Sequence, residues 1–349
     1  MQKQTTKIIA IILLVLVASS LAACNAAPAD EAYRFKYWNE CAALTSLQEY
    51  VEAVTDEKSP DYIPVADRIA VFDMDGTLYG ELFPTYFEYL LLAYRGLDDP
   101  DYTADEDVKA VAQTIRTSAQ TGSFPSDMPM RHALAQAKAF AGLTPGEFED
   151  YVHEFMKQTP AGFAGMTYGE AFYLPMLEVL DYLQKNAFKT YIVSGSDRFI
   201  CRALASEACH VPYEQIIGMD VKLEASGQGD QDSLDYQYTA DDKVVRTSTV
   251  LIKNLKTNKV LQIAQEIDKQ PVLSFGNSSG DVSMHVYTIT GNRYKSQAYM
   301  LIANDEARDY GNTAKTEQLG EQWRASGFNV ISMKDDWTTI YGAGVTKTE

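Results

Sequence analysis

Cysteine and histidine are scarce in this sequence, with four residues of each among 349. They are scattered along the chain, and no group of them has the spacing of zinc ligands. If residues 201–209 formed one continuous helix, a rise of about 1.5 Å per residue would separate Cys201 from Cys209 by roughly 12 Å, too far for a disulfide. The His210-Val211-Pro212 stretch could instead end that helix early. The disulfide state of these two residues and of Cys41 therefore stays open.

Positive charge is also in short supply, because 30 lysines and arginines face 48 acidic residues and the formal net charge is −18. A surface with this charge repels nucleic acid and anionic lipid. We therefore expect no nucleic-acid partner. Binding of an anionic small molecule requires local positive charge, from a metal ion or from particular lysines and backbone N–H groups. The sequence predicts no oligomeric state.

Apolar runs long enough to span a bilayer are missing as well. Residues 8–17 form an unbroken apolar run behind Lys3 and Lys7, which is typical of a secretory signal over residues 1–23. The signal ends in Leu-Ala-Ala-Cys at 21–24, which resembles the lipobox of bacterial lipoproteins. That resemblance implies cleavage before Cys24, lipidation of this residue, and a lipid anchor at the outer face of the bacterial cell membrane. An ordinary signal peptide with a chance cysteine is the alternative.

Five short apolar runs are present that have the length and composition of buried parallel strands. Helical patterns lie between several of them, and the alternation predicts an α/β fold with ligands at the carboxyl ends of the strands. The predicted strands are residues 69–72, 190–193, 272–275, 299–303 and 329–332, and the predicted helices include 35–54, 175–185 and 259–267.

Two insertions interrupt this alternation. Residues 84–170 are rich in Ala, Leu, Glu and Gln, and we interpret them as a separate helical cap. Residues 221–249 alternate in the manner of a β-hairpin. The predicted organisation is a tether with an N-terminal helix (24–60), a core built from 61–83 and 171–341, and the cap between the two core segments.

Polar residues follow the first three predicted strands. The first is followed by Asp73 and Asp75, the second by Ser194, and the third by Asn277 and Asp281. In an open parallel sheet these three strand ends converge on one crevice. Carboxylate and amide oxygens are the ligands that Mg²⁺ prefers, often together with a phosphate group. The sequence therefore predicts a magnesium site in this crevice.

The spacing of Asp73 and Asp75 also suggests that the two acids have different roles in catalysis. Two carboxylates this close raise each other's proton affinity, whereas a bound divalent cation keeps one of them ionised. The ionised group can act as a nucleophile that becomes an aspartyl-phosphate. Its neighbour can give a proton to the leaving group and later accept one from water.

Four motifs in this order resemble those of the haloacid dehalogenase-like (HAD) superfamily: D-x-D-G-T, S-G, a lysine that opens a helix, and G-N-x-x-x-D. The resemblance covers nearly the whole chain after residue 60, with a helical cap between the first and second motifs. It implies a Rossmann-like three-layer core with a C1-type cap, as in the phosphoserine phosphatase-like branch.

The resemblance implies a role for each matching residue. Asp73 would be the nucleophile and a ligand of Mg²⁺, and Asp75 would be the general acid/base and offer its backbone carbonyl to the metal. Thr77, Ser194 and the N–H group of Gly195 would bind the phosphoryl oxygens. A capping role at a strand-to-helix junction is the alternative for Ser194.

The lysine of the third motif has three candidates, Lys253, Lys256 and Lys259. We favour Lys259, because it begins the predicted helix that leads into strand 272–275. A solvated surface lysine is the alternative for each of the three.

The fourth motif departs from the family pattern at Asn277, where many members carry Asp. An amide oxygen still ligates Mg²⁺, and Asp281 keeps its charge, so we expect both in the metal site together with Asp73 and Asp75. The lost negative charge predicts a higher magnesium requirement. A Gly/Asn/Ser turn without a metal role is the alternative.

The substrate is less well defined than the chemistry. Glu81 lies near the position at which the phosphoserine phosphatase-like branch tends to place a substrate-reading acid, and a solvated loop acid is the alternative. Aromatic residues follow the first motif closely, at Tyr79, Phe83, Tyr86 and Phe87. With a nearby acid they could hold a quaternary ammonium group, as in phosphocholine phosphatases. The sequence is also compatible with a phosphotransferase or phosphomutase, and with a non-catalytic lipoprotein that binds phosphorylated ligands.

Overall fold

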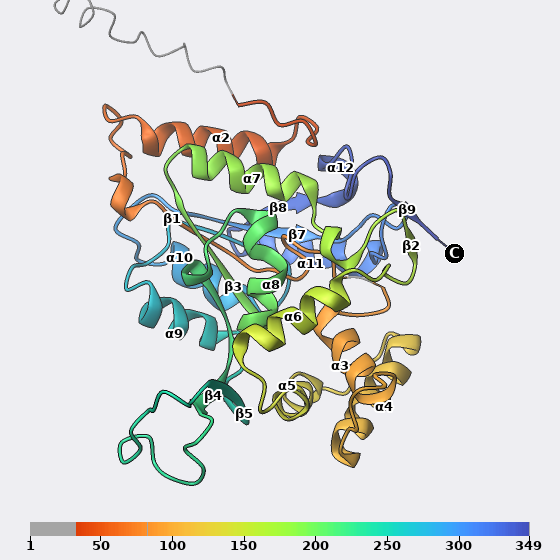
Figure 1. The fold of residues 1–349 in the computed structure, drawn as a ribbon. Coiled ribbons are helices and arrows are strands. Elements are labelled where there is room, and N and C mark those ends of the chain that lie inside the picture. Colours follow the sequence, from red (N-terminus) through yellow and green to blue (C-terminus); the bar gives the residue numbers. More distant parts are fainter. Residues whose placement is uncertain (1–32, 82, 349) are drawn as a thin grey trace, which may run out of the picture. The chain divides into compact units, whose positions relative to one another are not determined.

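A seven-stranded sheet forms the centre of the computed structural model, which describes residues 33–81 and 83–348 (Figure 1). The strand order is β5-β4-β3-β1-β6-β7-β8. All neighbours are parallel except β5, which pairs antiparallel with β4 at one edge. The predicted α/β fold is confirmed. The strands are β1 (Ile69–Phe72), β3 (Lys189–Asp197), β4 (Ile216–Ala225), β5 (Val244–Ile252), β6 (Leu273–Gly276), β7 (Gln297–Ile302) and β8 (Asn329–Ser332).

The five predicted strands are all present, and the main difference concerns the predicted hairpin. The hairpin is longer than residues 221–249, because β4 begins at Ile216 and pairs with β3 before it pairs with β5. The hairpin therefore extends the central sheet. A separate two-stranded sheet joins β2 (Phe163–Ala164) to β9 (Thr346–Lys347).

Helices cover both faces of the sheet. Ile263 of α9 and Met284 of α10 pack against Val71 and Val193 on one face. Along a strand the side chains alternate between faces, so Phe72 points to the opposite face, where its ring stacks on Phe275 with centroids 4.4 Å apart. Figure 1 shows α2 and α7 on one side of the sheet and α9 and α10 on the other. The flanking helices are α2 (Ala42–Thr55), α7 (Leu174–Lys185), α8 (Arg198–Cys209), α9 (Thr257–Glu266), α10 (Val282–Ile289), α11 (Thr313–Ala325) and the short α12 (Met333–Asp336).

The predicted helix over residues 35–54 begins later than expected, at Ala42. Cys41 caps it, since its sulfur accepts a hydrogen bond from the Leu44 N–H group at 3.5 Å. Before the cap, Trp38 forms a bridge to Trp337, and the two rings meet edge to face with centroids 6.0 Å apart. Packing of Trp38 in the core requires an extended backbone there, and it prevails over the helical pattern.

Residues 84–170 are helical, as their composition predicts, and Figure 1 shows their helices gathered beside the sheet. Their treatment as a separate cap domain stays a prediction. Tyr79, which follows β1, donates a hydrogen bond from its hydroxyl to the Tyr168 carbonyl at 2.7 Å and ties the end of this segment to the core. The helices are α3 (Phe87–Leu97), α4 (Glu106–Thr121), α5 (Met128–Ala139) and α6 (Pro145–Met156).

The cysteines after position 24 are all free thiols. Helix α8 runs without a break through Cys201 and Cys209, which explains why these two do not pair. The signal peptide and Cys24 lie outside the described residues. Within residues 33–81 and 83–348, no helix combines the length and apolar character needed to cross a membrane.

The buried side chain of His285 is expected to make the stability of the folded protein decrease at low pH. His285 of α10 is buried with Nδ1 2.7 Å from the Ser274 hydroxyl, and burial lowers its pKa from 6.5 to about 4. The folded state therefore favours the neutral ring, so the stability contributed by this group is present above pH 6.5 and is lost as the pH falls toward 4. Between pH 7.5 and pH 5 we expect a loss on the order of 2 kcal/mol from this residue. Urea unfolding at both pH values measures it.

His285→Asn is expected to reduce this pH dependence, whereas His153→Asn, at an exposed position on α6, is the matched control. An equal pH dependence in wild type and His285→Asn would contradict the prediction.

Candidate active site

The turn after β1 brings the two acids of the first motif to the end of the sheet. The Asp73 N–H group donates to the Phe275 carbonyl at 2.9 Å, so this residue still pairs with β6. Gly76 has a φ of +78°, and a Cβ atom there would lie 1.9 Å from Nδ2 of Asn277. Only glycine permits both this backbone conformation and this approach between the first and fourth motifs.

Lys259 joins the first and fourth motifs. Its ammonium group contacts Asp73 Oδ1 and lies 2.6 Å from Asp281 Oδ1, and all three side chains are buried. Burial lowers the pKa of an ammonium group, but the charges of Asp281 and Asp73 outweigh it and hold the pKa of Lys259 above its usual value. Of the three candidate lysines, Lys259 is the one that contacts Asp73 and Asp281.

Two carboxylates thus share one lysine in a buried place. Burial and the charge of Asp281 raise the pKa of Asp73. The pKa of Asp281 is lowered, because Lys259 outweighs the effect of burial. The second carboxylate oxygen of Asp281 accepts hydrogen bonds from the N–H groups of Asn277 and Ser278 at 3.2 and 3.0 Å. Asp281 is therefore the fixed anion of the pair, and Asp73 is the one with the higher proton affinity.

Asp75 lines the same cavity as Asp73, and one of its two carboxylate oxygens makes no hydrogen bond among the described residues. The Ser196 hydroxyl donates to its Oδ2 at 2.7 Å, whereas Oδ1 is buried and has no hydrogen-bond partner in the described part of the chain. Burial and the charge of Glu88 raise the pKa of Asp75 to about 7. A carboxyl group with this pKa can both donate and accept a proton near neutral pH.

The predicted phosphate-binding residues differ in their surroundings. The Thr77 hydroxyl is buried without a partner among the described residues. The Ser194 hydroxyl accepts a hydrogen bond from the Ser196 N–H group at 3.1 Å, and Ser194 is fully buried. Gly195 and Ser196 line the active-site cavity. The structure therefore places Ser196 at the cavity wall, with Ser194 behind it.

Glu81 and Asn277 contact each other. The amide group of Asn277 donates to Glu81 Oε1 at 2.8 Å. Burial raises the pKa of Glu81 to about 7, while the bond from Asn277 opposes the shift. An aspartate at position 277 would face Glu81 with a like charge, which gives the departure from the family pattern a physical reason.

The cavity above these residues has a volume of about 130 Å³. Sequence reasoning missed Glu88 and Tyr89 of α3, and it considered Lys253 only as a candidate for the third motif. The signal for Glu88 was an acid inside the apolar run Phe-Glu-Tyr-Leu at residues 87–90. The lining residues are Asp73, Asp75, Glu81, Tyr86, Glu88, Tyr89, Pro129, Gly195, Ser196, Lys253, Leu255, Lys259, Asn277, Ser278 and Asp281.

A second cavity of about 450 Å³ shares Glu81 and Tyr86 with the first. Phe83 and Tyr310 stack in its wall with ring centroids 4.2 Å apart. Burial raises the pKa of Asp309, a further acid in the wall, to about 6. The other lining residues are Pro84, Thr85, Gly122, Phe124, Tyr173, Ala303, Gly311 and Lys315.

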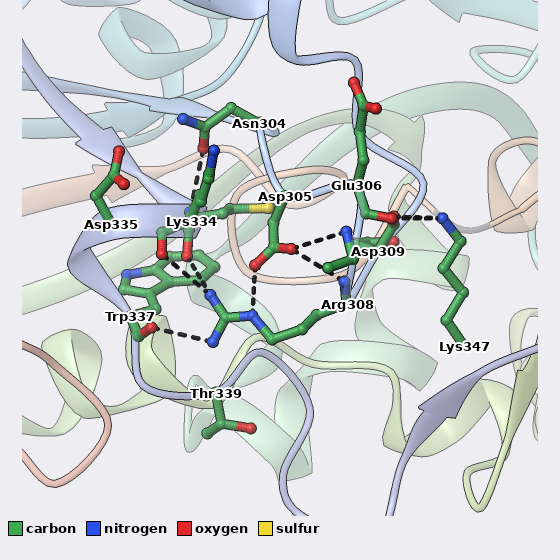
Figure 2. A network of polar contacts seen from close by, with 12 residues as sticks. Asn304, Asp305, Glu306, Arg308, Asp309, Lys334, Asp335, Trp337, Thr339 and Lys347 are labelled. Carbon is green, nitrogen blue, oxygen red and sulfur yellow. Dashed lines mark hydrogen bonds and ion pairs between the residues drawn. The ribbon is translucent and has the colours of Figure 1, made fainter.

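Figure 2 shows the polar contacts around the loop that carries Asp309. Arg308 contacts the Asp305 carboxylate, and its guanidinium also donates to the backbone carbonyls of Met333 and Trp337 at 2.8 and 3.0 Å. These bonds fasten the loop after β7 to the chain after β8. The hydrogen bonds of Arg308, which does not line the second cavity, therefore hold the wall of that cavity in place.

The Mg²⁺ expected from the sequence would be held by a mixed set of oxygen donors and not by a cluster of three acidic side chains. No group of three or more His, Cys, Asp and Glu side chains in residues 33–81 and 83–348 has an arrangement that could hold a metal. The oxygen donors at hand are the carboxylates of Asp73 and Asp281, the Asp75 carbonyl and the Asn277 amide. One lysine is shared by two buried carboxylates, and a dication would relieve the repulsion between them.

Comparison with known protein families identifies the family of this chain. The sequence model of the haloacid dehalogenase-like hydrolases matches residues 70–285, more than half of the chain. The chain belongs to this family. The predicted family and enzyme class are thereby confirmed. A search of curated proteins finds no match to this chain.

Solved structures that resemble this hydrolase are distant in sequence. A conserved protein of unknown function from Anaerococcus prevotii is 14% identical, with a TM-score of 0.50 over 87% of this chain and 96% of that one. Cytosolic 5'-nucleotidase IIIB bound to cytidine is 10% identical, with a TM-score of 0.49 over 83% and 85%. A phosphoserine phosphohydrolase-like protein from Francisella tularensis is 12% identical, with a TM-score of 0.39 over 76% and 94%. At these identities the likeness concerns the fold alone, and the two scores below 0.5 carry no argument.

Proposed function

We propose that this hydrolase is a Mg²⁺-dependent phosphomonoesterase that acts on a small phosphorylated metabolite through an aspartyl-phosphate intermediate. One observation carries the proposal: the buried Asp73 carboxylate is held by Lys259 beside Asp75, whose Oδ1 has no partner among the described residues. A nucleophile, a positive charge for the phosphoryl oxygens and a proton donor are thus collected at one point.

In the proposed reaction, a carboxylate oxygen of Asp73 attacks phosphorus and the bond from phosphorus to the ester oxygen breaks. The carboxyl group of Asp75 gives its proton to the departing oxygen. Asp75 then takes a proton from water as that water attacks the phosphorus of the aspartyl-phosphate, which releases inorganic phosphate and restores Asp73. The pKa of Asp75 near 7 suits both proton transfers.

The residues that would hold Mg²⁺ are Asp73, Asp281, Asn277 and the backbone carbonyl of Asp75. When bound, the ion supplies positive charge that lowers the repulsion between a phosphate dianion and the acid-rich site. Lys259 already holds Asp73 in position for attack. Thr77, Gly195 and Ser196 offer hydroxyl and N–H donors for the phosphoryl oxygens.

The size of the cavity supports a small substrate, such as the phosphoserine-like metabolites suggested by the sequence. About 130 Å³ is available around the catalytic acids. Lys253 and Glu88 lie at its wall, so a leaving group meets both a positive and a negative charge.

Phosphocholine is the second candidate substrate, and the second cavity is the observation that favours it. This cavity shares Glu81 and Tyr86 with the first cavity and combines aromatic rings with the acids Glu81 and Asp309. Aromatic faces beside a carboxylate attract a quaternary ammonium group.

Phosphoryl transfer to an alcohol and ligand binding without catalysis draw less support from the site. A non-catalytic lipoprotein that binds phosphorylated ligands has no need of a nucleophile and a proton donor, yet Asp73 is buried and the Oδ1 atom of the nearby Asp75 is buried as well. A phosphotransferase or phosphomutase shares these acids, and phosphoryl transfer to an alcohol in preference to water would distinguish it.

Removal of metal tests the proposed function. Hydrolysis of p-nitrophenyl phosphate by the purified protein is expected with Mg²⁺, and EDTA is expected to lower the rate about a hundredfold or more, because the metal supplies several kcal/mol of charge stabilisation. Added Mg²⁺ in excess of EDTA serves as the control and is expected to restore the rate. A panel with phosphoserine and phosphocholine then ranks the substrates, and activity indifferent to EDTA would contradict metal dependence.

The location of the protein remains a separate prediction. Export and a lipid anchor on Cys24 follow from the leader sequence, and that part of the chain lies outside the described residues. Labelling of cells with a radioactive fatty acid, compared between wild type and Cys24→Ser, would test it.

A further inference from the structure

A short turn, residues 253–256, connects strand β5 to helix α9 and contacts two of the four motifs. The Lys256 N–H group donates a hydrogen bond to the carbonyl of Gly280, in the fourth motif, at 2.9 Å. The side chain of Asn254 donates from Nδ2 to the carbonyl of Ser194, in the second motif, at 2.9 Å. The turn is therefore bonded to the second and to the fourth motif.

The leucine of this turn lies between the glycines of the same two motifs. A Cβ atom at Gly195 would lie 2.4 Å from Cδ2 of Leu255, and a Cβ atom at Gly280 would lie 3.6 Å from that atom. Leu255 and Gly195 both line the catalytic cavity. Apolar contact thus adds to the two hydrogen bonds in holding the turn against the cavity wall.

Asn254 is an expensive residue for its position. Its side chain is 0% exposed, and its Oδ1 atom has no hydrogen-bond partner among the described residues. A buried amide with an unpaired acceptor costs free energy, whereas a leucine of similar shape carries no polar atom that needs a partner. A cost of this kind is typical of residues that serve a functional site. What the Asn254 side chain does provide is a donor for the Ser194 carbonyl.

The Ser194 carbonyl and the Gly195 N–H group belong to the same peptide unit. This unit is planar and trans, so its C=O and N–H bonds point in opposite directions. The carbonyl points to the buried Asn254 side chain, and the N–H group therefore points away from it, on a residue that lines the cavity. The hydrogen bond from Asn254 fixes the orientation of the whole unit and polarises it, which makes the N–H group a stronger donor.

We infer that Asn254 is a positioning residue that orients the Gly195 N–H group toward an oxygen atom of the phosphoryl group being transferred. The inference rests on the proposed phosphomonoesterase function, in which this N–H group binds a phosphoryl oxygen. It goes beyond that function, since it names a buried residue that controls the donor. A donor that is already oriented stabilises the charge of the transition state without reorganisation during the reaction.

Asn254→Leu tests the inference, because it removes the side-chain donor and keeps a similar shape. Removal of an oxyanion donor costs about a hundredfold or more, but here the N–H group stays and loses only its fixed orientation, so kcat/KM is expected to fall about tenfold. The phosphoryl group is the same in every substrate. We therefore expect p-nitrophenyl phosphate and phenyl phosphate, which differ in the leaving group, to lose the same factor.

Binding of orthovanadate gives a readout that does not depend on turnover. Orthovanadate can adopt the five-coordinate geometry of a phosphoryl group in transfer, so its affinity reports on the groups that stabilise the transition state. With Mg²⁺ present, calorimetry is expected to show a Kd about tenfold higher in Asn254→Leu than in the wild type. The Kd of Mg²⁺ alone is expected to stay at the wild-type value, whereas a general loss of structure at the site would raise both.

Asn258→Leu is the matched control. The Asn258 side chain donates from Nδ2 to the Lys253 carbonyl at 2.9 Å, so this variant removes an amide bond of the same turn without touching Ser194. It is expected to keep kcat/KM and the vanadate Kd within about threefold of the wild type. Asn254→Ala, which removes the same donor as Asn254→Leu without adding apolar volume, is expected to show the same losses. Thermal unfolding is expected to place every variant within about 5 °C of the wild type.

The outcomes separate the two proposals. Wild-type vanadate affinity in both Asn254 variants would overturn the positioning role alone. So would an equal loss in Asn258→Leu, a loss of activity confined to one of the two esters, or failure of both Asn254 variants to fold, which would show a structural role. Absence of wild-type hydrolysis of every phosphomonoester would instead overturn the proposed function.

Discussion

Asp73→Asn is expected to lower hydrolysis of p-nitrophenyl phosphate about a thousandfold or more. An amide nitrogen or oxygen cannot replace the carboxylate as nucleophile, and loss of a covalent nucleophile removes a whole reaction path rather than one contact. The measurement is the steady-state rate with saturating Mg²⁺. Asp235→Asn, in the exposed loop between β4 and β5, is the matched control and is expected to retain the wild-type rate.

The stability of Asp73→Asn separates a catalytic role from a structural one. The Asp73 carboxylate is buried beside Asp281, and its pKa is raised by burial and by that neighbour, so its charge is held at a cost. Asparagine removes the charge, while Lys259 keeps Asp281 as its partner. The free energy of unfolding in urea at pH 7.5 is therefore expected not to fall. A variant that hydrolyses the substrate within tenfold of wild type would contradict the nucleophile assignment.

Lys259→Met is expected to lower the free energy of unfolding by about 3–5 kcal/mol, because it leaves two buried carboxylates without their cation. It is also expected to abolish detectable hydrolysis, since Lys259 holds Asp73 and would face the phosphoryl group. Urea unfolding in the absence of metal measures the first effect and the p-nitrophenyl phosphate assay the second.

Lys269→Met is the matched control for this effect. Lys269 pairs with Asp67 at 2.7 Å, but the two side chains are 44% and 28% exposed, so its loss is expected to cost less than about 1 kcal/mol. The double variant Asp73→Asn, Lys259→Met leaves a single buried carboxylate and is expected to recover part of the lost stability. Equal destabilisation by Lys259→Met and Lys269→Met would contradict the stabilising role of the buried Lys259 between Asp73 and Asp281.

Local patterns explain why much of the fold could be predicted. The runs at 69–72 and 329–332 match β1 and β8 residue for residue, because a short apolar run bounded by polar residues has few other places to be buried. The helix over residues 35–54 was predicted too long, since the bridge between Trp38 and Trp337 joins positions nearly three hundred residues apart. No local pattern contains that contact.

The candidate site also has parts that the sequence predicted and parts that only the structure shows. The order of the four motifs placed Asp73, Asp75, Asn277 and Asp281 at strand ends, where the structure finds them together. The sequence favoured Lys259 among three lysines because it begins the predicted helix before strand 272–275, and the structure adds its contacts with Asp73 and Asp281. Glu88 and Lys253 became neighbours only when α3 and the hairpin met at the cavity.

By itself the sequence determined the family, the sheet with its strand-end acids and the type of chemistry, because each motif and each strand is a short continuous stretch of the chain. The tertiary structure alone decided that Lys259 is shared by Asp73 and Asp281 and that Lys253 faces Glu88. These contacts join segments far apart in the sequence. They exist only because burial of the whole core brings the segments together, and no local preference of the chain encodes them.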